Sequence, residues 1–379
     1  MRIAIVLNGR FPTDKAYGVT TGATYKELVK LGHEVFIYAF PNQTKIEVDS
    51  IFKVESFSED FKSKFVRKLF SKNKRITSKI LWKIYLMKYL EWVKGDISKK
   101  KIELLWIRDY NSIKITEELR IKTLLEIHQK LDKQKISRLN QIKDLLVLAP
   151  ISKSLISNIE EFKGQKVFAP MGIGENFLTS KTEINKYCKS IKEKNKYTIT
   201  YAGKLFPGGI SKGTDVLIAI LNIIVSSKNN FKLKIVGGDQ KELFKLKRLF
   251  NYDYVKNYLE LIGQVEHEKV IQYLKETDFI ILPSSADPNY LGFPLKAIES
   301  CASGKIMLVE DCPTYRNIFA DESVTLIWFS KSNLSQLFDE IGNVLRNDQL
   351  ENLMLKNVHF AKEYVWANRI KKILSASGD

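Results

Sequence analysis

Short apolar runs alternate with stretches of helical periodicity from the first residues onward. Residues 3–7 form an apolar run typical of a buried strand, residues 23–31 repeat apolar positions at helical spacing up to Gly32, and residues 34–40 form a second apolar run. A strand, a helix and a strand in this order make a βαβ unit, which predicts a parallel sheet covered by helices. Further buried strands are expected at 104–107, 124–127, 145–151 and 166–169.

A polar, lysine-rich stretch with few apolar residues covers 180–196, and the same alternation begins again after it. We therefore predict a first domain at 1–178, a linker at 179–196 and a second domain at 197–379, whose last helix is a candidate for crossing back to the first domain. Two such α/β halves predict two Rossmann-like domains, with a ligand-binding cleft between them at the carboxyl ends of the strands. In the second half, strands are expected at 197–202, 231–236, 259–262 and 279–282, and helices at 214–225, 243–250, 268–276, 294–303, 334–345 and from about 350 onward.

The composition agrees with a folded protein of this size. The chain has 379 residues and is 44% hydrophobic, which excludes a disordered basic tail protein. Its three Cys residues contain no C-x-x-C pair, so neither a disulfide framework nor a zinc site is expected. No apolar run is typical of a secretory signal or long enough to span a bilayer, so we expect a soluble, cytoplasmic protein.

The charge changes this picture, because the formal net charge is +18 and most of it lies in one segment. Residues 62–101 contain 14 Lys or Arg against two acidic residues, a local net charge of +12. Between 80 and 93 the apolar residues recur at helical spacing, and Trp82 lies among Lys79, Lys83 and Lys88.

Two explanations of this basic segment stand side by side. A basic amphipathic helix with aromatic residues at its edges is typical of a membrane-surface element. An ordinary helix that packs on the sheet and turns its lysines to solvent explains the same pattern. Nucleic-acid binding is not expected, because no zinc-finger spacing, RNP motif or helix-turn-helix pattern accompanies the charge.

Candidate chemistry in the second half begins at a glycine-rich turn. Gly203 and Lys204 end the first strand of this half, and Lys212 and Gly213 open the next helix. Two ammonium groups beside the free N–H groups of a helix N-terminus suit a diphosphate. Taken alone, the segment is better explained by a flexible surface loop that contains lysines.

A second candidate segment covers 283–305. Pro294 fits the first position of a helix, Lys296 lies in its first turn, and Glu299 follows one turn later on the same face. A carboxylate at this place could accept hydrogen bonds from a ribose diol. The alternative is a Lys296–Glu299 surface pair, which would contribute little to stability.

His128 is the candidate functional residue of the first half. Of the four histidines, it alone follows an apolar strand directly, in the segment LLEIH, where residues that bind ligands are commonly placed. A packed, hydrogen-bonded histidine is the alternative at such a position.

Taken in order, these segments resemble retaining GT-B glycosyltransferases of the family-four type, a large group of bacterial surface-polysaccharide enzymes. The donor half is similar in GK…SKGTDVLI, LKIVGGD, IGQV, DFIILPSS and GFPLKAIESCASGK, and the acceptor half in FPTDKAYGV, GHEV, LLEIH and KVFAPMGIGENF. The resemblance covers nearly the whole chain. A dehydrogenase would need G-x-G-x-x-G in the first turn, and NGRFPTDKAYG does not fit it.

The resemblance implies roles for particular residues. Lys204, where the family usually has Arg, and Lys212 would hold the nucleotide diphosphate, Glu299 would bind the ribose, and Gly18 would let the phosphate approach a helix. His128 would act on the donor sugar, with Lys204 and Lys212 assisting catalysis. The first Glu of the family's E-x7-E motif is replaced by Leu291, although Pro294, Lys296 and Glu299 fit a P-x-K-x-x-E subgroup. The full set of implied donor-binding residues is Gly18, Gly203, Lys204, Lys212, Gly292, Phe293, Pro294, Leu295, Lys296 and Glu299.

The activity implied is retaining transfer of a sugar from a UDP- or GDP-linked donor to a glycan or lipid-linked acceptor, in cell-surface polysaccharide or lipopolysaccharide biosynthesis. No D-x-D motif is evident, so no metal or other cofactor is expected. A peripheral position on the inner face of the cell membrane would explain the basic segment. Two alternatives remain. A non-catalytic binding protein is suggested by Leu291 in place of the Glu, whereas a sugar-nucleotide epimerase on the same fold would need carboxylates around the sugar and is disfavoured by Leu291.

Overall fold

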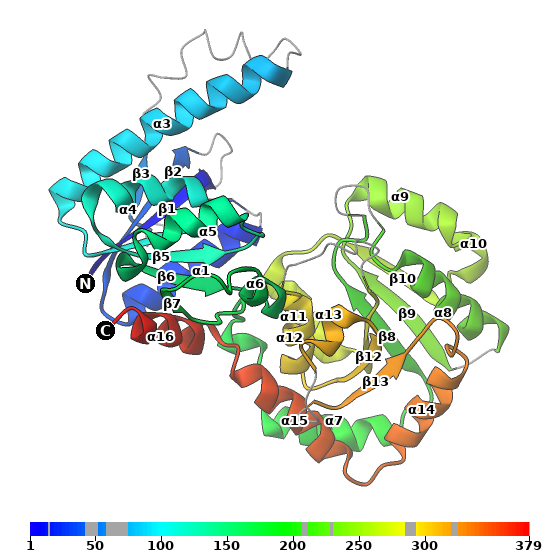
Figure 1. Ribbon diagram of the computed structural model, residues 1–379. Coiled ribbons are helices and arrows are strands. Elements are labelled where there is room, and N and C mark those ends of the chain that lie inside the picture. Colours follow the sequence, from blue (N-terminus) through cyan, green and yellow to red (C-terminus); the bar gives the residue numbers. More distant parts are fainter. Residues whose placement is uncertain are drawn as a thin grey trace. The chain divides into compact units, whose positions relative to one another are not determined.

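The computed structural model of the chain describes residues 1–13, 16–41, 52–57, 75–206, 211–227, 230–284, 293–319 and 324–378. Within these ranges the chain forms two compact units (Figure 1). The first contains Met1–Gly172, Leu291–Phe293 and Trp366–Asp379, and the second contains Ile173–Tyr290 and Pro294–Val365. Each unit is built on one parallel sheet, so the predicted fold class of two Rossmann-like α/β halves is confirmed.

The sheet of the first unit has the strand order β3-β2-β1-β4-β5-β6-β7 among the described residues. The order reverses between β1 and β4, and the carboxyl ends of strands at such a switch point are where α/β sheets bind ligands. The strands are β1 (Arg2–Phe11), β2 (Glu34–Pro41), β3 (Val54–Ser56), β4 (Leu104–Ile107), β5 (Lys122–Ile127), β6 (Leu146–Pro150) and β7 (Gln165–Lys166). The helices are α1 (Ala16–Lys30), α3 (Arg75–Lys100), α4 (Ile113–Leu119), α5 (Lys133–Asn140), α6 (Lys153–Asn158) and α16 (Trp366–Ala376).

The last helix of the chain, α16, belongs to this first unit and contacts α1 (Figure 1). Its apolar residues Ile370, Ile373 and Leu374 are buried in the same cluster as the strands of the first sheet. Because it packs on the sheet through this stripe, the C-terminal end of the chain completes the core of the N-terminal unit.

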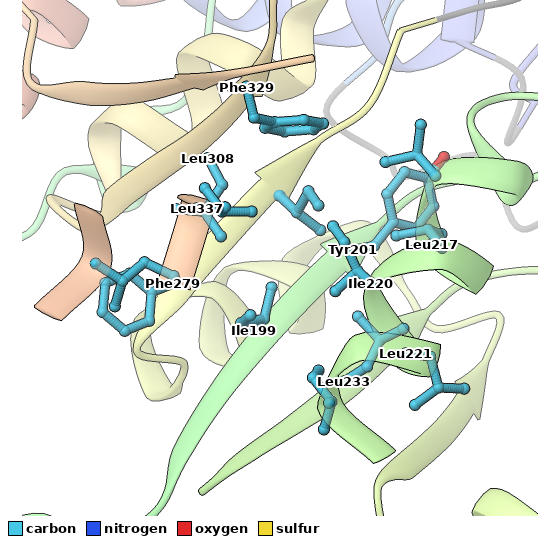
Figure 2. Packing of buried hydrophobic residues seen from close by; sticks show 14 of the residues in the cluster. Ile199, Tyr201, Leu217, Ile220, Leu221, Leu233, Phe279, Leu308, Phe329 and Leu337 are labelled. Carbon is cyan, nitrogen blue, oxygen red and sulfur yellow. The ribbon is translucent and has the colours of Figure 1, made fainter. Parts of the chain in front are cut away.

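The sheet of the second unit has the order β10-β9-β8-β11-β12-β13 and reverses between β8 and β11. Leu217 and Ile220 of α8 (Thr214–Ser226) are buried in one hydrophobic cluster with Ile199 of β8 and Phe279 of β11 (Figure 2). The strands are β8 (Tyr197–Ala202), β9 (Phe231–Val236), β10 (Leu259–Gly263), β11 (Phe279–Leu282), β12 (Ile306–Glu310) and β13 (Leu326–Phe329). The helices are α7 (Lys181–Lys192), α8 (Thr214–Ser226), α9 (Gln240–Leu249), α10 (Tyr252–Val255), α11 (His267–Glu276), α12 (Leu295–Ala302), α13 (Pro313–Arg316), α14 (Gln336–Leu345) and α15 (Leu350–Lys362).

The segment 179–196, predicted to be a linker, instead contains helix α7 and belongs to the second unit. Ser180 and Glu183 form a capping box at its N-terminus, in which each side chain accepts a hydrogen bond from the backbone of the other residue. Ile184 and Ile191 lie two turns apart and are buried in the core of the second unit. Because these two apolar residues pack in the core, the segment is a helix of the second unit and not a linker.

Candidate functional site

A cavity of about 630 Å³ lies at the carboxyl ends of β8 and β11, the switch point of the second sheet. Its volume is in the range of small-molecule sites. One wall is apolar and includes Val270, Leu274 and Leu282, while cationic and carboxylate side chains face it from other elements. The predicted residues that line this cavity are Gly203, Lys204, Lys212, Pro294, Leu295, Lys296 and Glu299.

Two glycines allow the backbone to approach this cavity closely. Gly203 follows β8 with φ +142°, and Gly213 precedes α8 with φ +70°, both in regions that L side chains rarely adopt. A β-carbon on Gly213 would overlap the ring of Pro283, which follows β11. The N-terminus of α8 therefore reaches the end of β11 only because residue 213 has no side chain.

Three lysines give the cavity its positive charge. Lys204 is exposed, while Lys212 and Lys296 are half-buried. The Nζ atom of Lys296 lies 3.3 Å from the hydroxyl of Tyr201 and 4.5 Å from the centre of its ring. The pKa of Lys296 is lowered to about 7, first by burial and then by the charge of Lys212, while Glu299 acts in the opposite direction. An anion in the cavity would counter both effects and favour the charged form of Lys296.

Glu299, on α12, is buried and bonded to a residue that the sequence analysis did not select. Its Oε1 atom lies 2.7 Å from Nε2 of His267, the first residue of α11. This hydrogen bond raises the pKa of His267, although burial acts against it. No spacing along the chain indicates this pair, because its members are 32 residues apart and meet only in the folded sheet.

His128 directly follows β5 in the first unit and lies against a buried carboxylate. Its Nε2 atom is 2.8 Å from Oε2 of Glu126, which also pairs with Arg108 at 3.1 Å. The other oxygen of Glu126 pairs with Arg369 of α16 at 2.7 Å. Burial acts to raise the pKa of Glu126, but the two guanidinium groups outweigh it and hold that pKa well below its usual range.

Arg108 joins this cluster to the N-terminal turn of α1. Its Nη1 atom donates to the carbonyl of Tyr17 at 3.1 Å and to Oγ1 of Thr20 at 2.7 Å. Gly18, predicted in the loop after β1, lies inside the first turn of α1, where a β-carbon would overlap Thr13. Arg108, Glu126 and Arg369 were all missed from sequence, since arginines and a strand carboxylate carry no motif by themselves.

Of the predicted donor residues that the structure describes, Gly18 and Phe293 do not line the cavity. Gly292 lies outside the described residues, and Phe293 is a buried residue that clusters with the first unit. Pro294 precedes α12 and is not its first residue, although Lys296 does lie in the first turn. Helix α12 therefore begins at Leu295, one residue later than predicted.

The basic segment is confirmed as a helix, α3, over part of its predicted length. Leu86, Tyr89, Leu90 and Val93 are buried, and they form the face that packs on the unit. Residues 58–74 lie outside the described part of the chain, and so does the side chain of Lys79.

The opposite face of α3 combines exposed apolar and basic side chains. Ile84 and Met87 are 44% and 56% exposed, and Lys83 and Lys88 are exposed beside them. Trp82 is 41% exposed and packs edge-on against Phe40 at 5.5 Å. Among the helices described here, none is long and apolar enough to cross a membrane.

Comparison with known proteins identifies the class to which this arrangement belongs. The glycosyltransferase from Rickettsia africae has the same fold, with a TM-score of 0.73 at 16% identity over 99% of this chain and 97% of that protein. The Anabaena protein HepE, solved in complex with UDP and glucose, gives a TM-score of 0.65 at 12% identity over 99% of this chain and 98% of that protein. The fold is thus that of GT-B glycosyltransferases, as the resemblance found in the sequence implied.

The sequence of the second unit is similar to a known family. Residues 183–360 match the family described as glycosyl transferases group 1. The GPI3 subunit of phosphatidylinositol N-acetylglucosaminyltransferase from Saccharomyces cerevisiae is 23% identical over 191 residues, which are 48% of this chain and 39% of that protein. The chain therefore spans about two fifths of the length of this curated relative.

Proposed function

We propose that this protein is a glycosyltransferase that uses a nucleoside-diphosphate sugar as its donor. The observation that carries the proposal is the cavity of the second unit, in which Lys204, Lys212 and Lys296 meet Glu299 at the switch point of the sheet. The cavity lies in the part of the chain that matches the family of group 1 glycosyl transferases. The complex of HepE with UDP and glucose supports a nucleotide sugar as the ligand of this fold.

Each wall of the cavity suits one part of such a donor. The three lysines and the N-terminus of α8 would hold the diphosphate, because ammonium groups and free N–H groups stabilise its charge. The free oxygen of Glu299 would accept a hydrogen bond from the ribose. Val270, Leu274 and Leu282 offer an apolar surface to the base. Gly203, Pro294 and Leu295 also line the cavity, and they would let the backbone come close to the ligand.

We propose that transfer occurs with retention and without a metal ion. Departure of the diphosphate from the anomeric carbon leaves an oxocarbenium-like sugar and a growing negative charge. Lys204 and Lys212 would stabilise that charge, which is the task a metal performs in other transferases. His128 would orient and polarise the donor sugar, and the leaving phosphate would assist the incoming hydroxyl.

The acceptor is proposed to be lipid-linked, and the protein to bind the inner face of the cell membrane. The exposed face of α3 presents Ile84 and Met87 between Lys83 and Lys88, which suits an anionic lipid surface. The name of the yeast relative includes phosphatidylinositol, which is a phospholipid, and this supports a lipid-linked acceptor here. Assembly of a cell-surface polysaccharide or lipopolysaccharide is the setting we propose.

A screen of UDP- and GDP-sugars tests the proposal. Binding raises the apparent thermal stability in proportion to affinity, so the accepted nucleotide is found first by thermal shift. Slow release of the nucleotide from the matching sugar donor is the result expected of a transferase. Isomerised sugar nucleotide would replace this proposal with an epimerase, and the absence of any binding would replace it with a non-catalytic protein.

A further inference from the structure

Helices α9 and α10 carry the two most exposed large hydrophobic side chains of the described part of the chain. Phe244 is 65% exposed and Tyr254 is 71% exposed, while Leu249, the last residue of α9, is 46% exposed. The two helices contact each other beside β10, the edge strand of the second sheet (Figure 1). A single exposed hydrophobic residue is common on a protein surface, but a group of them in one short segment indicates a contact surface.

The inward face of this segment is packed without these exposed residues. Leu246, Phe250 and Val255 are buried in the hydrophobic cluster of the second unit. Phe244 precedes Leu246 by two positions, which places it about 200° away around the helix axis. Phe244 therefore points away from the core, and the packing of the unit does not require an aromatic residue there.

Basic residues surround Phe244 at helical spacing. Lys241 precedes it by three positions, and Lys247 and Arg248 follow it by three and four positions, so they lie on the same face of α9. The full set of exposed basic residues in the two helices and their ends is Lys241, Lys245, Lys247, Arg248 and Lys256. None of them forms an ion pair with a carboxylate of the described residues, so their charge can meet an anionic partner.

The acidic residues of the segment do not cancel this charge. Glu242 accepts hydrogen bonds from the backbone N–H groups of Asp239 and Phe206. Asp239 caps α9 by accepting from the backbone N–H groups of its first turn. Asp253 is the one exposed carboxylate of α10. The outward face of α9 is therefore both aromatic and cationic.

We propose that α9 and α10 form a second membrane-binding surface, which docks on a bilayer rich in anionic lipid. Aromatic side chains insert among the headgroups, and the long basic side chains bury their apolar stems while their charges reach the lipid phosphates. Helix α7 is also lysine-rich, but none of its side chains is among the exposed large hydrophobics. The combination of exposed aromatic residues with positive charge, and not the charge alone, thus distinguishes α9 and α10. This surface rests on the membrane contact proposed for α3 and extends it to the second unit, but it does not depend on sugar transfer.

Co-sedimentation of the full chain with anionic vesicles, without any donor sugar, tests the aromatic part of the surface. Phe244→Ala should lower the partition coefficient about tenfold, because the bilayer loses most of one buried aromatic side chain. Phe244→Trp is the matched control and should bind at least as well as the wild type. Both changes lie at an exposed position, so Tm should be unchanged in both variants.

Charge reversal tests the cationic part. Lys241, Lys247 and Arg248 changed together to Glu should weaken binding about a hundredfold at low salt, and the difference should shrink at high salt. The control is the same change at Lys186, Lys189 and Lys192 of α7, which are exposed but have no exposed aromatic residue among them. That control should lose far less binding.

A second background separates this surface from α3. In a chain that carries Lys83→Glu and Lys88→Glu, the remaining binding should fall again when Phe244→Ala is added. Equal binding by Phe244→Ala and the wild type would overturn the proposal and confine the membrane contact to α3. Loss of a dimer in light scattering, with vesicle binding unchanged, would also overturn it and assign the surface to self-association. Turnover is measured separately, so an inactive wild type would reject the transferase while the vesicle result still decides the role of α9 and α10.

Discussion

Nε2 of His267 lies 2.7 Å from Oε1 of Glu299, so the buried carboxylate of the cavity is already bonded before any ligand binds. The two side chains come from α11 and α12, which follow different strands of the sheet. The pair occupies Oε1 of Glu299, and Oε2 is the oxygen that we propose as the acceptor for a ligand hydroxyl. It also makes one histidine of the cavity sensitive to pH.

The His267–Glu299 pair should stabilise the protein in acid more than in base. The hydrogen bond to Glu299 raises the pKa of His267 above its ordinary value of 6.5, so the stabilisation is fully present below that value and is lost as the pH rises through the raised pKa. His267→Gln should therefore lower Tm more at about pH 5.5 than at about pH 8.5. His359→Gln, at an exposed position of α15, is the control. Equal losses at both pH values would contradict the prediction.

Lys296 should take up a proton when a nucleotide diphosphate enters the cavity. Its pKa is lowered to about 7 by burial and by Lys212, and the diphosphate would raise it again. Calorimetry of UDP binding at about pH 8, in buffers of different ionisation enthalpy, should show uptake of up to about one proton. Lys296→Met should abolish the uptake, while the exposed Lys204, changed to Met, should not. No uptake by the wild type would rule out this role.

Lys212→Ala should abolish turnover while leaving the fold intact. Lys212 lines the cavity one residue before the αL glycine that starts α8, and it is half-buried. Removal of one preorganised contact to developing charge lowers kcat about 10²- to 10³-fold. The measurement is the rate of nucleotide release, with circular dichroism as the test of folding. Unchanged activity would show that Lys212 does not stabilise the diphosphate.

Gly213→Ala should destabilise the second unit. The φ of +70° and the overlap of a β-carbon with Pro283 would cost about 1–3 kcal/mol, measured by denaturant unfolding. Gly95→Ala is the matched control, because Gly95 lies in α3 with no heavy atom near its would-be β-carbon. That variant should instead stabilise by up to about 1 kcal/mol. A neutral effect of Gly213→Ala would mean that α8 can move away from β11.

Charge reversal on α3 should weaken binding to anionic vesicles. Lys79, Lys83 and Lys88 changed together to Glu would replace attraction by repulsion, with about 1 kcal/mol lost per removed cation. Co-sedimentation with vesicles rich in anionic lipid, at low and high salt, measures the effect. The control is the same change at Lys186, Lys189 and Lys192, which are exposed on α7. Equal binding by the α3 variant and the wild type would leave α3 as an ordinary packed helix.

The strands were the part of the fold best predicted from sequence. The runs at 104–107 and 279–282 coincide with β4 and β11, because a strand buried on both faces is a continuous apolar run. Helix α7 was missed although the sequence contains its signal, Ser180 three residues before Glu183 and then apolar positions at 184 and 191. The lysine content of the segment hid that pattern.

The sequence by itself determined the class of fold, most of its strands and several residues that line the cavity of the second unit. Those features depend on the periodicity of apolar residues within each element and on glycines that the local backbone conformation requires. Tertiary structure alone decided that His267 meets Glu299, that Arg108 and Glu126 contact His128, and that Arg369 pairs with Glu126. Glu126 and Arg369 are 243 residues apart, and parallel crossovers bring such residues together without leaving any trace in their spacing. The raised pKa of His267 and the lowered pKa of Glu126 follow from these contacts, and therefore from the fold.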